Sequence, residues 1–187
     1  MKKTNVKRIC AAGILLSVGI VLPFITAGIP QIGNMLLPMH LPVLLAGLLL
    51  GGRDGAIIGA TLPLLRSVMF SSPTLFPRAI AMSAELLTYG LVVGVCYKLL
   101  SRTRLHISVC SFISLVISML LGRVVWGIVM LIILGGQTFT FTLFLTHAFV
   151  NATLGIAALL FSVPLIFEAL RQTQFFSWLK NKSLLTF

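Results

Sequence analysis

The sequence has little negative charge and no long polar stretch. Its 187 residues include three acidic side chains, Asp54, Glu85 and Glu168, against fourteen Lys and Arg. Residues 9–52 and 124–167 contain no Lys, Arg, Asp or Glu. A hydrophobic fraction of 58% and a mean hydropathy of +1.11 exceed what a soluble core of this size can bury. These absences exclude an ordinary soluble domain and predict an integral membrane protein.

Motifs for catalysis, metal binding and nucleotide binding are also missing. There is no H-E-x-x-H, no G-x-S-x-G, no pair of carboxylates and no Cys and His cluster at metal-ligand spacing. A G-x-x-x-x-G-K-[ST] loop for ATP phosphates is missing too. We therefore expect that the chain is not an enzyme and binds no metal or cofactor itself. Energy for uphill transport would have to come from another source.

Apolar runs separated by helix breakers predict an all-α membrane bundle of six spans in a single domain, 1–187. The spans cover roughly 9–27, 39–52, 54–70, 78–98, 106–134 and 141–170. A continuous helix over 39–70 would be about 48 Å long, against a hydrocarbon core of about 30 Å. We therefore interpret residues 51–55, which include Arg53 and Asp54, as a tight Gly-rich turn. No A-x-A cleavage site follows the first run, which favours a retained helix.

Basic residues gather in alternate connections between the spans. One set precedes the first span, occupies the second and fourth turns and follows the sixth span: Lys2, Lys3, Lys7, Arg8, Arg53, Lys98, Arg102, Arg104, Arg171, Lys180 and Lys182. Retention of such residues on the cytoplasmic side predicts that both termini are cytoplasmic. Because they flank apolar spans, we expect them to contact membrane lipid, and we expect no nucleic-acid partner.

Three charged residues, Arg66, Glu85 and Arg123, lie within predicted spans and away from the charged span ends, where each costs about 2.5 to 3.5 kcal/mol to insert. This topology places them in the outer half of the membrane or near its middle. Helical spacing adds Met82, Tyr89, Trp126, His147 and Asn151. Methionines, aromatics and a few convergent polar groups are typical of a small-molecule pocket. A buried Glu–Arg pair that only holds helices together is the alternative.

Small residues form a further pattern in the first span. Gly13 and Ser17 are four residues apart, with Ala12 adjacent. Such a pair lets another helix approach closely, either in a partner protein or in the same bundle.

Four ordered segments carry a resemblance to a known family. They are LPMHLPVLLAG at 37–47, PLL at 63–65, MSAELLTYG at 82–90 and GRVVWG at 122–127. In order and spacing they resemble the substrate-binding subunits of energy-coupling-factor (ECF) vitamin transporters. The likeness is greatest to the branch assigned to pantothenate, pyridoxine or hydroxymethylpyrimidine.

The resemblance implies a multi-pass subunit of the prokaryotic cell membrane that binds a small-molecule vitamin at its outer side. The vitamin would lie under the loop between the first two helices, here 28–38. The partners would be a transmembrane coupling subunit and two cytoplasmic ATPase subunits, which use the ATP. The subunit would topple in the membrane to release its cargo. The Ala-x-x-x-Ala docking motif of the family corresponds to Gly13 and Ser17.

Site roles follow from the resemblance together with the spacing. We expect Glu85 and Arg123 to hold polar groups of the ligand, and Tyr89 and Trp126 to stack on it. The remaining candidates are His147 and Asn151 as hydrogen-bonding residues, His40 as an anchor of the outer loop, and Met82 and Arg66. Two arginines facing one carboxylate slightly favour a carboxylate ligand such as pantothenate over a neutral pyridine or pyrimidine alcohol. The alternative function is that of a stand-alone secondary transporter.

Overall fold

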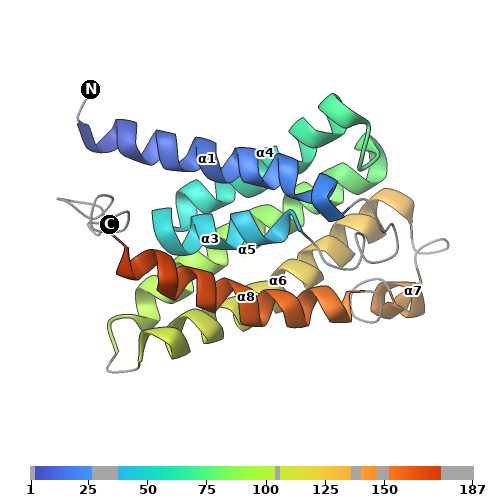
Figure 1. Cartoon of the computed structure of the whole chain (residues 1–187). Helices are drawn as coiled ribbons and strands as arrows, with labels where there is room; N and C mark the ends of the chain where they lie inside the picture. The colour runs from blue at the N-terminus through green and yellow to red at the C-terminus, as the bar shows by residue number, and fades with distance from the viewer. Residues whose placement is uncertain (1–2, 27–37, 104–105, 136–139, 147–151, 174–187) are drawn as a thin grey trace.

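The computed structural model describes residues 3–26, 38–103, 106–135, 140–146 and 152–173, and over these ranges the chain is helical, without strands (Figure 1). The elements are α1 Lys3–Thr26, α3 His40–Leu50, α4 Gly52–Phe70, η1 Leu75–Ala79, α5 Ile80–Leu100, α6 Ile107–Leu134, α7 Phe141–Leu145 and α8 Thr153–Gln172. The prediction of an all-α fold is confirmed.

Four of the described helical stretches are long and apolar enough to cross a membrane. They are Val6–Phe24, Leu75–Leu100, Ile107–Leu134 and Thr153–Gln172. Helix α3 is apolar but has 11 residues, and α4 has 19 residues that include Arg53, Asp54 and Arg66. The last crossing helix begins at Thr153, later than the predicted 141, and the short helix α7 precedes it. The count of six spans stays a prediction.

The break between α3 and α4 is shorter than the predicted turn. Only Gly51 leaves the helical conformation, with φ 100° and ψ 165°, where a side chain would be strained. Arg53 and Asp54 therefore lie in the first turn of α4, which corrects their expected position in a loop. The Asp54 carboxylate is favourable there because a helix N-terminus carries partial positive charge.

Arg8 ties the start of α1 to this break. Its Nη2 lies 2.6 Å and its Nε 3.0 Å from Oδ2 of Asp54. The same Nη2 donates to the Leu50 carbonyl oxygen at 3.1 Å. One guanidinium thus joins α1 to the end of α3 and the start of α4.

Glycines bring the backbones of α3, α4 and α5 into direct contact. A Cβ on Gly90 of α5 would overlap the carbonyl group of Gly55 on α4. A Cβ on Gly55 would lie 2.7 Å from the Cα of Gly47 on α3. In lipid, small residues of this kind allow the close packing that drives helix association. Residues 47, 55 and 90 therefore set the spacing of α3, α4 and α5, and two of these helices, α3 and α5, contribute to the site described below.

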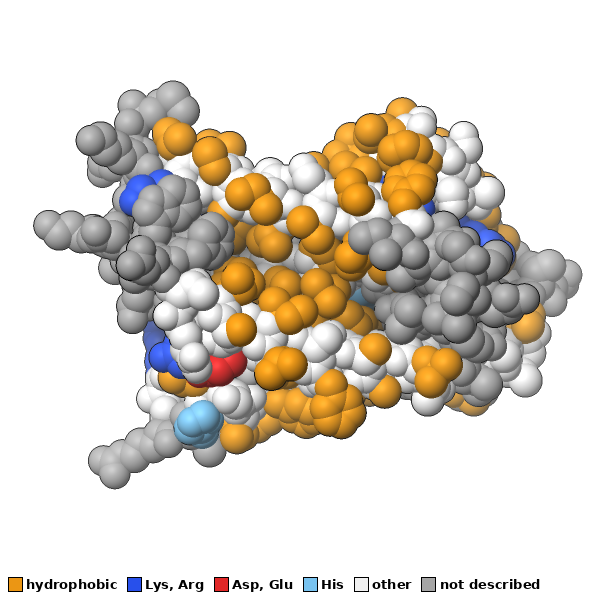
Figure 2. Space-filling view, viewed as in Figure 1, with side chains coloured by type: hydrophobic (Ala, Val, Ile, Leu, Met, Phe, Trp, Pro, Cys, Tyr) orange, Lys and Arg blue, Asp and Glu red, His pale blue; other side chains and the backbone are white. Residues whose placement is uncertain are grey.

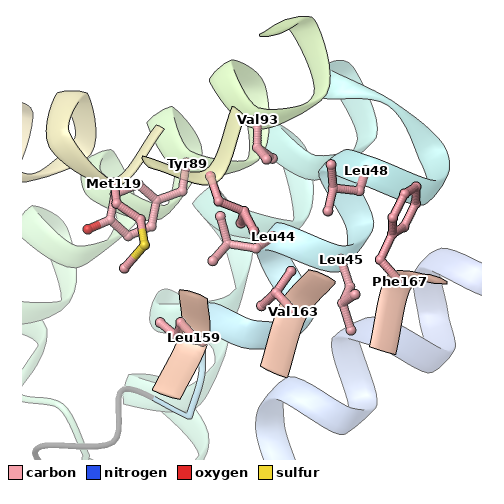
Figure 3. Close-up of a cluster of buried hydrophobic side chains, with 10 residues drawn as sticks. Leu44, Leu45, Leu48, Tyr89, Val93, Met119, Leu159, Val163 and Phe167 are labelled. Carbon is pink, nitrogen blue, oxygen red and sulfur yellow. The ribbon is translucent and has the colours of Figure 1, made fainter. Parts of the chain in front are cut away.

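The other side of α3 packs against α8. Figure 3 shows Leu44, Leu45 and Leu48 between Tyr89 and Val93 of α5 and three side chains of α8. The α8 residues are Leu159, Val163 and Phe167. Helix α3, although short, is therefore the centre of the bundle, with α4 and α5 on one side and α8 on the other.

The surface fits lipid around the middle of the molecule. Apolar side chains cover much of the face in Figure 2, with Lys and Arg toward its ends. Several large apolar side chains are at least 70% exposed: Val68, Ile132, Phe161 and Leu165. Figure 1 places the start of α1 and the end of α8 at one end of the bundle.

The glycine contacts give opposite expectations for two Gly-to-Ala changes. Gly90→Ala should lower the free energy of unfolding by about 1–3 kcal/mol, because the added methyl group meets the α4 backbone. Gly13→Ala should raise it by up to about 1 kcal/mol, because a Cβ there has nothing within 4 Å and Ala favours helix. Unfolding in detergent measures both, and equal effects would contradict the close contact.

Candidate functional site

Glu85 is the centre of a buried polar cluster contributed by three helices. Its Oε1 accepts a hydrogen bond from the Tyr89 hydroxyl at 2.8 Å, one turn along α5. Nη1 of Arg123, on α6, lies 3.0 Å from the same oxygen. Nε2 of His40, at the start of α3, lies 3.7 Å away, beyond hydrogen-bond distance. The structure therefore brings together four of the predicted site residues.

The cluster is closed to water. Relative exposure is 2% for Glu85, 0% for Tyr89, 1% for His40 and 6% for Arg123. At such burial, removing one partner of an ion pair leaves an uncompensated charge and costs several kcal/mol. The interaction between Glu85 and Arg123 is therefore a strong constraint on how α5 and α6 pack.

Gly122 allows α6 to lie close enough to α5 for Arg123 to reach Glu85. A Cβ on Gly122 would overlap the ring of Tyr89, so the ring lies directly on the α6 backbone. Met119, on the neighbouring turn of α6, packs in the same cluster as Tyr89 (Figure 3). The His40 ring completes the arrangement, with its centroid 5.4 Å from that of Tyr89. With its ring held between α3 and α6, Tyr89 donates its hydroxyl hydrogen to Glu85.

Several donors and acceptors in the cluster are left without partners. Within the described residues, Nε and Nη2 of Arg123 and both ring nitrogens of His40 are buried without a hydrogen-bond partner. Each unsatisfied buried group costs about 1–3 kcal/mol. Such groups are rare in native proteins and call for an explanation, such as a ligand that completes them.

Arg66 does not belong to this cluster. Its Nε donates to the Ser72 carbonyl oxygen at 3.1 Å, and its Nη1 to the Ile20 carbonyl oxygen at 3.4 Å. Its guanidinium also lies 5.1 Å from the ring centroid of Phe24. The expectation that two arginines face Glu85 is therefore wrong: among the described ion pairs, Arg123 pairs with Glu85 and Arg66 does not. Arg66 lies in the last turns of α4, where its long side chain reaches the carbonyl groups of α1 and of the chain after α4.

The other predicted site residues lie around the cluster or outside the described ranges. Trp126 is partly buried and stacks on Phe144 of α7, with centroids 6.4 Å apart. Met82 packs against the apolar cluster shared by α1, α3 and α4. His147 and Asn151 lie outside the described residues, as does the outer loop apart from Pro38.

A comparison with protein families gives a match over most of the chain. The sequence model described as "ECF transporter, substrate-specific component" matches residues 7–169. The chain belongs to this family. It is therefore a multi-pass membrane protein and the substrate-binding subunit of a transporter, and it is not an enzyme. Comparisons with curated proteins and with solved structures gave no match.

In this substrate-specific component, the two small residues of α1 face away from the bundle. Gly13 and Ser17 are exposed, and a Cβ on Gly13 would have nothing within 4 Å. The Ser17 hydroxyl donates to the Gly13 carbonyl oxygen at 2.9 Å and so stays close to the helix. Ala12 is partly buried and packs against the cluster shared with α3 and α4. Of the three residues, Gly13 and Ser17 are therefore the ones exposed on the outer side of α1.

Sequence reasoning identified the charged residues of the substrate-specific component but missed Gly122 as a site residue. An isolated Gly inside a helical pattern, next to a buried Arg, was the available signal. Its role depends on the Tyr89 ring, which comes from a different helix, so spacing along α6 could not reveal it.

The contact of Gly122 with Tyr89 can be tested by a double-mutant cycle. Gly122→Ala should lower the free energy of unfolding by about 1–3 kcal/mol, because the methyl group displaces the Tyr89 ring. In a Tyr89→Ala background the same change should cost much less, since the ring is gone. Additive effects in detergent unfolding would show that the two residues do not contact each other.

Proposed function

We propose that this chain is the substrate-capture subunit of an ATP-driven ECF-type importer, and that Glu85, Tyr89, His40 and Arg123 hold a water-soluble vitamin or its precursor. The buried nitrogens of Arg123 and His40 without partners in the described part of the chain carry this proposal. A polar ligand would supply the missing hydrogen bonds.

The alternative is that the polar cluster only holds the bundle together. A structural pair should satisfy its donors, because each buried orphan reduces stability. Arg123 instead uses Nη1 for Glu85 and leaves Nε and Nη2 unpaired within the described residues. A ligand-binding role accounts for both observations.

Pantothenate, pyridoxine and hydroxymethylpyrimidine are the proposed ligands, from the resemblance of the four sequence segments. The reason for preferring pantothenate was a spare positive charge on Arg66. Because Arg66 contacts α1 and Ser72, that reason no longer applies. Trp126, Met82, His147 and Asn151 remain proposed contributors to the walls of the site.

The proposed partners are a transmembrane coupling subunit and two cytoplasmic ATPase subunits. This chain would bind no cofactor, and the ATPase subunits would use the ATP. The outward face of α1 around Gly13 and Ser17 supports docking of the coupling subunit, because small exposed residues permit close helix approach.

The proposed topology has six spans with both termini in the cytoplasm. The start of α1 and the end of α8 lie at the same end of the bundle in Figure 1. The described basic residues on helix ends and turns at that end are Lys3, Lys7, Arg8, Arg53, Lys98, Arg102 and Arg171. This bias supports a cytoplasmic location of that end, in contact with anionic lipid.

Arg123→Lys tests the binding site. Lysine keeps the positive charge beside Glu85 but lacks the Nε–H and Nη2–H groups that Arg123 would offer to the ligand. We expect vitamin binding to the purified protein to weaken roughly tenfold to a hundredfold, with little change in unfolding. Arg171→Lys, on partly exposed α8 surface, is the control and should bind normally. Normal binding by Arg123→Lys would remove Arg123 from the site.

Gly13→Leu tests the docking surface. The larger side chain has room in the isolated subunit, so vitamin binding should be unchanged. Co-purification with the coupling subunit and ATPases should fall, because leucine blocks close helix approach. Complex formation at the wild-type level would contradict docking at this face.

Vitamin uptake by vesicles containing this chain alone under an ion gradient would instead support a secondary transporter.

A further inference from the structure

We infer that the site selects an uncharged ligand that offers two adjacent hydrogen-bond acceptors to Arg123. The inference rests on the proposed function and adds the charge class of the ligand. It is based on two observations: one nitrogen of the Arg123 guanidinium pairs with Glu85 while the other two have no partner in the described residues, and Glu85 already supplies a negative charge.

The free edge of Arg123 defines the shape of the ligand group. Nη1 is used for Oε1 of Glu85 at 3.0 Å, whereas Nε and Nη2 have no partner in the described residues. Nε and Nη2 lie on the same edge of the planar guanidinium, where their N–H groups point in parallel. Two acceptor atoms side by side on the ligand would satisfy both at once.

The carboxylate of Glu85 defines the charge of the ligand. Arg123 contributes one positive charge and Glu85 one negative charge, and the pair is neutral as a unit. A ligand carboxylate on the free edge would place a second negative charge on the same guanidinium. With side-chain exposures of 7% and 2% for the two residues, water cannot compensate that charge. Arg66 cannot compensate it either, because its guanidinium is engaged with α1 and Ser72.

The remaining neighbours offer neutral hydrogen bonds. The Tyr89 hydroxyl already donates to Glu85. His40 has both ring nitrogens buried without hydrogen-bond partners in the described residues. A ligand hydroxyl can pair with one of these nitrogens whether that nitrogen donates or accepts, because a hydroxyl does both. The combined pattern fits an uncharged molecule with carbonyl, ring-nitrogen or hydroxyl acceptors next to each other.

Matched ligand pairs test the charge class. Pantothenol and pyridoxine are neutral overall, whereas pantothenate and 4-pyridoxate carry a carboxylate in place of a neutral group. We expect the wild-type protein to bind the better neutral compound at least tenfold more tightly than its carboxylate partner. Titration calorimetry on purified protein in detergent measures the ratio. A tighter carboxylate would overturn the inference.

Glu85→Gln tests the cause of the preference. Glutamine keeps an acceptor for Tyr89 and Arg123 but removes the compensating charge. The ratio of affinities should move at least tenfold toward the carboxylate, and the carboxylate should raise the melting temperature of this variant. Glu168→Gln is the same chemical change on α8, beside Arg171, and should leave the ratio unchanged. An unchanged ratio in Glu85→Gln would overturn the inference.

The two proposals fail in different ways. If Arg123→Lys binds normally, the location of the site is wrong. If Arg123→Lys loses binding but the wild-type protein prefers carboxylates, the site stands and the charge class is wrong. If none of the four compounds binds, the molecule that co-purifies with the protein is identified by mass spectrometry, and an anion there would overturn the inference.

Discussion

The ion pair between Glu85 and Arg123 is the constraint on which the rest of the bundle depends. It lies inside a membrane protein, where neither charge can be left alone, so α5 and α6 must pack with these residues adjacent. Tyr89 of α5 donates to the same Glu85 oxygen, and the His40 ring of α3 lies against the Tyr89 ring. Helices α5 and α6 are therefore joined at one oxygen atom, with α3 packed beside them. That arrangement leaves Nε and Nη2 of Arg123 buried without a hydrogen-bond partner among the described residues.

Close helix packing makes this polar centre possible. Gly47, Gly55 and Gly90 bring α3, α4 and α5 to backbone contact, and Gly122 does the same for α6 and the Tyr89 ring. Without side chains at these positions the helices come near enough for short polar groups to meet. The apolar cluster shared with α8 then covers the other side of α3 (Figure 3). The close approach of the helices at these glycines is therefore what lets the polar side chains meet at the centre.

The sequence was most informative where the membrane imposes a cost. Uncharged runs predicted the all-helical fold, and the rarity of charge inside them identified Glu85 and Arg123 as neighbours. It was least informative about long side chains and helix ends. Arg66 could extend toward several places, and its contacts with Ile20 and Ser72 depend on how α1 and α4 meet. Likewise, charge in the 51–55 segment suggested a loop, whereas one glycine is enough to reverse the chain.

Helix α1 is fastened near both ends to the α3–α4 pair and contributes no side chain to the polar cluster. Arg8 holds its start through Asp54 and Leu50, and Arg66 holds its later part through Ile20. A force on the outward face of α1 would reach α3 and α4 through these two separated contacts. In the proposed importer, a partner that pulls on α1 would therefore load Arg8 and Arg66, which are not part of the proposed ligand contacts around Glu85.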